Sequence, residues 1–249
     1  MLNRWLFFVC LMFLGQRAFS VEVTVFAAAS LSDAFKEIAP LYTTATSHTL
    51  RFNFGASGVL ARQIKEGAPA DVIFSADELR VDQLEKAGLL LPGTRRTILA
   101  NTLVVVVAVE GGAAVKTLAD LAKADVRRIA IGEPATVPIG TYTKEYLQKT
   151  GDWKKLIDKL VPLDTVRATL AAVESGNAEA GFVYKTDALI SKRVKIAIEV
   201  PQADGPKITY PVAVLKDAKQ PEAAKALVKF LAGPEAQKVF AKFSFLPPN

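Results

Sequence analysis

The sequence predicts an α/β fold with mixed, mostly parallel sheets flanked by helices. Short runs rich in Val, Ile and Phe alternate with amphipathic segments whose apolar residues recur at helical spacing. Four of these segments are followed by a glycine at the position where helices commonly end, namely Gly67, Gly88, Gly151 and Gly176. Such alternation of strands and helices is typical of parallel strands joined by helical crossovers.

Residues 1–20 form a unit of their own, which we interpret as a secretory signal peptide. Arg4 precedes an apolar run over 5–15, and Ala18-Phe19-Ser20 fits a small-residue cleavage site. The run is too short to span a bilayer, and a buried N-terminal helix is the alternative. Cys10, the only cysteine, lies inside this run, so we expect no thiol or disulfide chemistry in the exported chain.

The exported chain, residues 21–249, is expected to begin with a strand and to end with two helices. Strands are expected at 22–28, 49–54, 71–75, 102–108, 129–132, 180–184, 194–200 and 208–215. Helices are expected at 31–39, 58–66, 78–87, 117–123, 141–149, 152–160, 166–175, 185–192, 220–232 and 234–243. Ser30 suits the N-cap of the first helix, with Asp33 in a capping-box-like position.

Two places favour a crossing of the chain between two lobes. Ala100-Asn101-Thr102 precedes one apolar run, and Thr209-Tyr210-Pro211 precedes another. Pro211 inside a strand-like run indicates an edge strand or a bend. We therefore predict lobe I from residues 21–100 plus 212–249, lobe II from residues 101–211, and a hinge between them. A single continuous sheet is the alternative.

Candidate binding groups gather where predicted strands run into helices. In open α/β sheets ligands bind beyond the carboxyl ends of strands, and the free amides at helix starts favour anions. The groups offered at these junctions are hydroxyls and backbone amides, from Ser30, Ser57, Ile139, Val166 and Tyr184. We interpret Asp71 and Asp77 as structural turn or cap residues.

Other classes of protein are disfavoured. The net charge of +6 is spread along the chain, without the clustering of basic and aromatic residues that marks a nucleic-acid surface. The sequence has no cofactor fingerprint and no metal-ligand spacing, so we expect no cofactor and no directly coordinated metal. A secreted serine hydrolase would need Ser57 as nucleophile and His48, the only histidine, as base. The stretch 55–59 departs from the nucleophile-elbow pattern at Val59, so we expect a binding protein and not an enzyme.

The junctions carry an ordered set of motifs: Phe26-Ala-Ala-Ala-Ser30-Leu, Phe54-Gly-Ala-Ser57, Gly67-Ala-Pro-Ala-Asp71-Val-Ile-Phe-Ser75-Ala-Asp77, Pro138-Ile-Gly140-Thr-Tyr142, Asp164-Thr-Val166-Arg167, Gly181-Phe-Val-Tyr184 and Tyr210-Pro-Val-Ala-Val214. This set resembles the motifs of the periplasmic molybdate-binding proteins of ABC importers. The resemblance covers essentially the whole exported chain and implies a location in the periplasm and a two-lobed type II periplasmic-binding-protein fold that closes by a hinge motion.

The resemblance also implies a ligand and a role for each candidate residue. Ser30 and Ser57 would give hydroxyl and backbone donors from lobe I to the oxygens of molybdate or tungstate. Lobe II would donate hydrogen bonds from the amides of Ile139 and Val166 and from the hydroxyl of Tyr184. The protein would then contact the oxygens of the anion and would not coordinate its metal directly. Position 139 is more often a small residue in the family, and whether the Ile139 side chain narrows the pocket is open at this point.

The partners implied are the small oxyanion and the membrane permease of an ABC transporter. We expect a monomer that is not embedded in the membrane and binds no nucleic acid. A receptor of the same fold for sulfate or thiosulfate is the first alternative, and the secreted hydrolase is the second.

Overall fold

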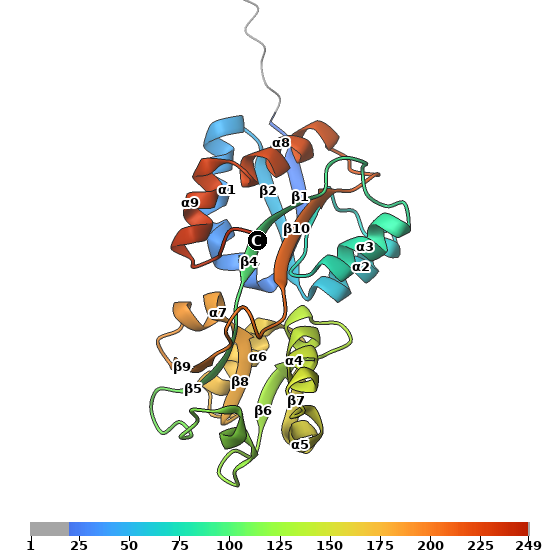
Figure 1. Ribbon diagram of the computed structural model, residues 1–249. Helices are drawn as coiled ribbons and strands as arrows, with labels where there is room; N and C mark the ends of the chain where they lie inside the picture. Colours follow the sequence, from blue (N-terminus) through green and yellow to red (C-terminus); the bar gives the residue numbers. More distant parts are fainter. Residues whose placement is uncertain (1–19, 249) are drawn as a thin grey trace, which may run out of the picture.

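The computed structural model describes residues 20–248, which form two lobes, each built around a five-stranded sheet (Figure 1). The first sheet has the order β2 (Thr49–Gly55), β1 (Glu22–Ala28), β3 (Val72–Phe74), β10 (Ile208–Val214), β4 (Arg96–Asn101). The second has the order β7 (Leu160–Leu163), β6 (Ile129–Gly132), β8 (Ala180–Tyr184), β5 (Leu103–Ala108), β9 (Val194–Glu199). The alternative prediction of a single continuous sheet is therefore wrong. The predicted signal peptide lies outside the described residues, apart from Ser20.

Helices cover both faces of each sheet. The first lobe holds α1 (Ser32–Thr46), α2 (Ser57–Lys65), α3 (Glu78–Lys86), α8 (Pro221–Leu231) and α9 (Pro234–Lys242). The second lobe holds α4 (Pro138–Lys149), α5 (Trp153–Leu156), α6 (Val166–Glu174) and α7 (Lys185–Ile190). Three 3₁₀ turns complete the elements, η1 (Ala29–Leu31), η2 (Leu118–Ala122) and η3 (Ile157–Lys159). Within residues 20–248 we find no helix both long and apolar enough to cross a bilayer.

The direction of each strand depends on where the chain enters its lobe. The pairs β1–β2, β1–β3, β6–β7 and β6–β8 are parallel. Every antiparallel pair contains β5 or β10, the strands that follow the two crossings between lobes. These two strands start at the interface between the two lobes, which we call the seam, and run away from it. The parallel strands β1, β2, β3, β6, β7 and β8 instead end at the seam, so their carboxyl ends face one another. The sheets are mixed as predicted, although parallel pairs do not outnumber antiparallel ones.

The two crossings lie close to their predicted places. The chain first crosses at Thr102, between β4 and β5, and crosses back over residues 200–207. The strand β10 belongs wholly to the first sheet, whereas the predicted division assigned residues 208–211 to lobe II. Pro211 lies at a register shift in β10, an irregularity of the kind at which strands bend. The strand is not at an edge, because it pairs with β3 on one side and β4 on the other.

Three predicted elements differ from the structure, and one observed strand was not predicted. The first helix continues through Pro40 to Thr46, because its apolar face continues with buried Tyr42. The segment predicted as a helix over 152–160 is α5, η3 and the start of β7, which pairs with β6 as an edge strand and so tolerates Pro162. The strand β4 is absent from the prediction, and the helix expected at 117–123 is the short turn η2.

Candidate functional site

The five candidate residues line one cavity between the lobes. Ser30 and Ser57 come from the first lobe, and Ile139, Val166 and Tyr184 come from the second; all five are buried. The remaining lining residues are small or apolar apart from Thr165: Ala28, Ala29, Gly55, Ala56, Ala76, Val137, Pro138 and Thr165. The cavity volume is about 10 Å³, roughly what one water-sized sphere needs.

Ser30 lies in the 3₁₀ turn η1, directly after β1. The prediction that it caps the first helix is wrong, because α1 begins at Ser32 with Leu31 at the N-cap and no side-chain cap. The Ser30 Oγ instead lies 3.1 Å from the hydroxyl of Tyr210. Asp33 likewise makes no capping bond and forms ion pairs with Lys36 and Arg167.

The hydrogen bonds around Ser30 determine the direction of its hydroxyl hydrogen. The Tyr210 hydroxyl accepts a hydrogen bond from Asn101 Nδ2 at 3.1 Å. Its own hydrogen needs an acceptor, since buried polar groups are rarely left unpaired, and Ser30 Oγ is the acceptor in reach. The Ser30 hydrogen is therefore free to point into the cavity.

Ser57 has the same arrangement as Ser30. It is the first residue of α2, where the backbone amide has no acceptor within the helix. Its Oγ accepts a hydrogen bond of 3.0 Å from the amide of Ala76, which follows β3. Because Oγ is already used as an acceptor, the Ser57 hydroxyl hydrogen is left for a ligand.

Two helix starts in the second lobe point amides toward the cavity. Ile139 and Val166 lie in the first turns of α4 and α6, where amides lack acceptors within the helix. Thr165 caps α6 by accepting a hydrogen bond from the Ala168 amide. The Ile139 side chain packs over Gly132, where an added Cβ would lie 2.8 Å from its Cγ2. Gly132 thus makes room in the second lobe for the larger residue at position 139.

The hydroxyl of Tyr184 is the group in the cavity lining that most needs a hydrogen-bond acceptor. Tyr184 ends β8, is 1 % exposed, and its hydroxyl has no hydrogen-bond partner among residues 20–248. Burial raises the pKa of Tyr184 well above its ordinary value of 10.0, so the hydroxyl keeps its proton. A buried hydroxyl without a partner costs about 1–3 kcal/mol. An acceptor bound in the cavity would remove this cost.

The cavity lining carries hydrogen-bond donors and no charge. Among residues 20–248, none of the side chains that line it is Asp, Glu, Lys, Arg or His. A nearby guanidinium, that of Arg167, is held outside by Asp33 and Asp187, at 2.7 and 2.8 Å. The site can therefore hold an anion by fixed dipoles and helix starts, and it offers little to a ligand that must itself donate.

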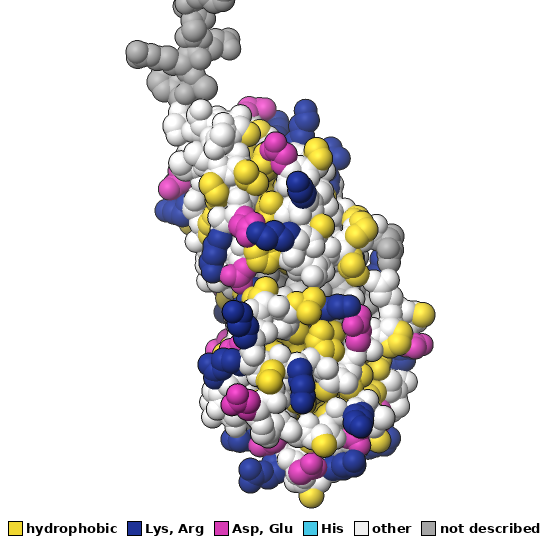
Figure 2. Space-filling model, turned by 90° about the vertical axis from the view of Figure 1, so that its left-hand side faces the viewer, with side chains coloured by type: hydrophobic (Ala, Val, Ile, Leu, Met, Phe, Trp, Pro, Cys, Tyr) yellow, Lys and Arg dark blue, Asp and Glu magenta, His cyan; other side chains and the backbone are white. Residues whose placement is uncertain are grey.

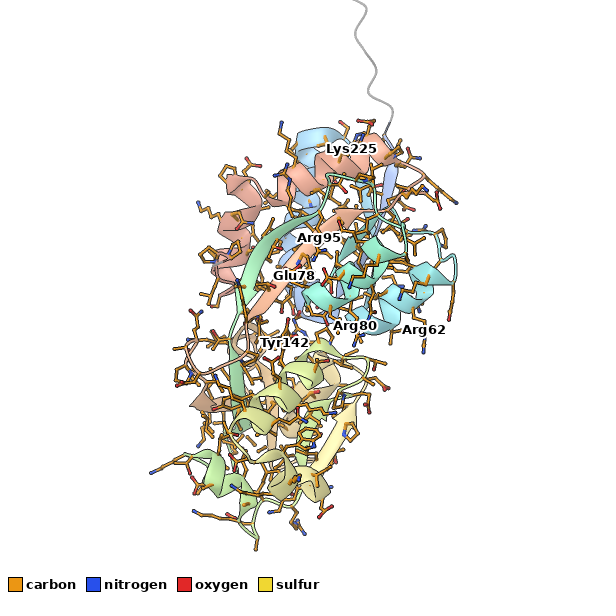
Figure 3. The ribbon with its side chains drawn as sticks, turned by 45° about the vertical axis from the view of Figure 1, so that its right-hand side comes forward. Arg62, Glu78, Arg80, Arg95, Tyr142 and Lys225 are labelled. Atoms are coloured by element: carbon orange, nitrogen blue, oxygen red, sulfur yellow. The ribbon has the colours of Figure 1, made fainter. Side chains whose placement is uncertain are left out.

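Direct contacts between the lobes close one side of the cavity. The amide of Gly58 in α2 donates to the carbonyl of Thr136 at 3.0 Å. Arg80 in α3 donates to the carbonyl of Ala135 at 2.7 Å, and Tyr142 in α4 donates to the carbonyl of Ala76 at 3.3 Å. Figure 3 shows Arg80 and Tyr142 at the seam, one from each lobe. The structure thus has its lobes in contact around the site.

The hydrolase alternative fails on geometry. His48 directly precedes β2, whereas Ser57 follows the other end of the same seven-residue strand. At about 3.3 Å per residue, the strand separates the two side chains by roughly 20 Å. His48 accepts a hydrogen bond from the Val21 amide instead. Within residues 20–248 no group of His, Cys, Asp and Glu could hold a metal ion.

Asp71 and Asp77 have the structural roles predicted for them. Asp77 caps α3 by accepting from the Arg80 amide at 3.1 Å. Asp71 accepts from the amides of Thr24 and Gln220, at 2.7 and 3.0 Å, and so joins β1 to the start of α8.

Three further residues of this site have no role in the prediction: Asn101, Arg167 and Tyr210. Arg167 and Tyr210 lie within the family motifs, and Asn101 and Tyr210 lie at the predicted crossings. The sequence thus marks their positions, but it gives no sign of their contacts.

Comparison with known proteins places the chain in a family. Residues 23–246 match the model of the bacterial extracellular solute-binding proteins. A putative ABC transporter substrate-binding lipoprotein of Bacillus subtilis, YvgL, is 41 % identical over 226 residues, covering 90 % of this chain and 86 % of its own. The molybdate-binding protein ModA of Escherichia coli is 38 % identical over 228 residues, covering 90 % and 88 %.

Solved structures show the same fold. The periplasmic molybdate-binding protein of Azotobacter vinelandii superposes with a TM-score of 0.82 at 26 % identity, covering 91 % of this chain and 100 % of its own. The sulfate-binding protein SubI of Mycobacterium tuberculosis, at 18 % identity and a TM-score of 0.76 over 91 % of this chain and 87 % of its own, shares the fold alone. The predicted two-lobed binding-protein fold and the predicted resemblance are both confirmed. This chain belongs to the bacterial extracellular solute-binding proteins, a family of binding proteins and not of enzymes.

Proposed function

We propose that this protein binds molybdate or tungstate in the cavity between its lobes and delivers the oxyanion to the membrane permease of an ABC transporter. One observation carries the proposal: Tyr184 presents a buried, unpartnered hydroxyl to a small cavity without charged side chains. The hydroxyl hydrogens of Ser30 and Ser57 are also free to point into it. The names of the relatives support molybdate as the ligand.

In this proposal each lobe holds one side of a tetrahedral anion. Ser30 and Ser57 donate from the first lobe, and Ile139, Val166 and Tyr184 donate from the second. The protein itself supplies no metal ligand, because the metal is reached only through its oxygens. The protein acts as a monomer in the periplasm, and no cofactor takes part.

Two physical features determine selectivity among oxyanions. A site that only donates hydrogen bonds disfavours protonated phosphate, whose O–H group would be buried without an acceptor. The second feature is size: the space of about 10 Å³ must widen to admit any tetrahedral oxyanion, and a pocket fitted to the longer metal–oxygen bonds of molybdate and tungstate disfavours the smaller sulfate. A sulfate or thiosulfate receptor is the rival in the same fold, and competition among anions distinguishes it.

Thermal unfolding of the protein with different anions tests the proposal. Residues 21–249 are unfolded with sodium molybdate, tungstate, sulfate, phosphate or chloride at one ionic strength. A ligand at one hundred times its dissociation constant adds about 2.7 kcal/mol, which corresponds to roughly 5–10 °C for a chain of this size. We expect this shift with molybdate and tungstate alone. A shift with sulfate alone would transfer the proposal to the rival ligand, and no shift with any anion would contradict it.

A further inference from the structure

Arg167 joins the two lobes immediately outside the cavity. It follows Val166 in the first turn of α6, in the second lobe. Its Nη2 lies 2.7 Å from Asp33 Oδ2 in α1 of the first lobe, and the same nitrogen donates to the Ser30 carbonyl at 3.4 Å. Its Nε lies 2.8 Å from Asp187 Oδ1 in α7 of its own lobe. One guanidinium therefore contacts both lobes and the backbone of a candidate ligand-binding residue.

The three contacts differ in whether they survive opening of the lobes. Asp33 and Ser30 lie across the seam from Arg167, so separation of the lobes breaks both of these contacts. Asp187 moves together with Arg167, because α6 and α7 pack in the same lobe. Asp187 is fully buried, and its carboxylate lies beside the guanidinium within the same lobe, so this contact does not require the lobes to meet. The bridge to Asp33 is thus specific to the closed arrangement, and its cation is already positioned before the lobes meet.

This bridge lies on a different side of Ser30 from the ligand. Arg167 contacts the Ser30 carbonyl, whereas the hydrogen of the Ser30 hydroxyl is free to point into the cavity. Asp33 and Arg167 do not line the cavity in the described part of the chain. The pair therefore makes no direct contact with a ligand in the cavity, and its bridge across the seam acts through closure of the lobes.

We infer that Asp33 and Arg167 form a latch that holds the lobes closed and sets how long the oxyanion stays bound. This inference rests on the proposed function. Arg167 and Asp33 act as positioning residues, because neither touches the ligand. Breaking the latch should speed release and leave capture unchanged, since the open state in which the ligand enters lacks the bridge. Both side chains are about one-quarter exposed, so we expect a roughly three- to tenfold effect on the release rate.

The chain offers a matched pair of variants in one helix. Asp33→Asn removes the carboxylate charge that the first lobe contributes to the bridge, and it leaves every candidate hydrogen-bond donor to the ligand in place. Lys36→Gln removes the other ion pair of Asp33, a 2.7 Å contact within α1 that does not cross the seam. Association and release of ⁹⁹Mo-labelled molybdate are measured by rapid filtration, release being started with excess unlabelled molybdate, and ligand-free thermal unfolding is recorded for each variant.

We expect Asp33→Asn to release molybdate three to ten times faster, with the association rate and ligand-free unfolding temperature unchanged, and Lys36→Gln to match the wild type. Equal release rates for wild type and Asp33→Asn would overturn the latch. A double-mutant cycle with Arg167→Gln adds a second criterion, because a latch requires the double variant to release no faster than Arg167→Gln alone. If the unaltered protein binds no molybdate, the proposed function itself fails, and this outcome is distinct from a failure of the latch.

Discussion

The hydroxyl of Tyr210 lies 3.1 Å from Oγ of Ser30, and this contact joins the hinge to the candidate site. Tyr210 lies in β10, just after the second crossing between lobes, and Asn101 lies at the first crossing. Asn101 Nδ2 donates to both Tyr210 and Thr186, at 3.1 and 2.9 Å. A chain of hydrogen bonds thus runs from the second lobe through both crossings to Ser30, and fixes Ser30 as a donor toward the cavity.

Tyr210→Phe should weaken molybdate binding although Tyr210 lies outside the cavity. Without the phenol, Ser30 loses the donor that orients its hydroxyl, and we expect a cost of about 1–2 kcal/mol, or roughly five- to thirtyfold in dissociation constant. Calorimetric titration measures the affinity. Tyr42→Phe is the matched control, because it loses a buried hydrogen bond of 2.9 Å to the Ala223 carbonyl away from the site. Unchanged affinity in Tyr210→Phe would refute the orienting role.

Tyr184→Phe should change stability and affinity in opposite directions. The Tyr184 hydroxyl has no partner among residues 20–248 when the lobes are in contact, so its removal should leave the free energy of unfolding unchanged or raise it by about 1 kcal/mol. The same change removes a donor to a charged ligand, worth about 1.5–3 kcal/mol of binding. Urea unfolding without anion and calorimetric titration with molybdate separate the two effects. A clear loss of stability would mean that the hydroxyl has a structural partner.

Gly58→Ala should hinder closure of the lobes. An added Cβ at position 58 would lie 2.4 Å from the Thr136 carbonyl oxygen, which belongs to the opposite lobe. A backbone atom cannot move aside as a side chain does, so the lobes must stay slightly apart, and we expect at least tenfold weaker molybdate binding. The first lobe should fold normally, because the clash exists only across the seam. Lys65→Ala, at an exposed position of the same helix, is the control, and equal affinities for the two variants would disprove the close-contact argument.

Asp187 should give the ligand-free protein a distinct pH dependence. Burial raises the pKa of Asp187 from 3.8 to about 6, against the opposing effect of Arg167; the Asp33 carboxylate raises it further and Thr186 lowers it. Between pH 4 and 6 the folded chain keeps a proton that the unfolded chain releases. The free energy of unfolding therefore falls as pH rises through this range.

The comparison with Asp187→Asn isolates this contribution. Relative to that variant, the wild type should lose about 2–3 kcal/mol of stability between pH 4 and pH 7. Urea unfolding at pH 4, 5, 6 and 7 without anion measures the difference. Parallel pH profiles for the two proteins would show that Asp187 has an ordinary pKa.

Local sequence predicted the strands and helices that carry the site. Strands such as β1 and β8 are apolar runs followed directly by helix signals, so their ends, and with them Ser30 and Tyr184, could be located. The strand β7 could not, because Leu160–Leu163 contains a proline and follows a segment of helical composition. It is a strand because it pairs with β6. Likewise β4 owes its strand structure to pairing with β10, more than one hundred residues away in the chain.

The contacts that orient the site residues were beyond local reasoning. Ser30 and Tyr210 are 180 residues apart, and Arg167 lies 137 residues from the Ser30 carbonyl that it contacts. No spacing rule connects such positions. The N-cap assignment for Ser30 was wrong for the same reason, since its hydroxyl bonds to a distant tyrosine and not to the adjacent helix.

The charged surface contributes little to the attraction of anions. Figure 2 shows acidic and basic side chains interspersed over the visible face, with no broad region of one sign. A net charge of +6 distributed in this way gives only mild long-range attraction of anions. If the proposed function holds, discrimination among oxyanions therefore depends on the uncharged cavity.

The place of β10 in the first sheet also constrains the order in which the chain can fold. The second sheet is built from the continuous stretch β5–β9, so all its strands are present once residue 199 has been synthesised. The first sheet stays incomplete until β10 is added, because this late strand lies between β3 and β4 and pairs with both. Until then β3 and β4 have open edges of the kind that favours aggregation. The first lobe is therefore completed after the second. A truncation before residue 208 would leave its sheet without β10, the strand that joins β3 to β4.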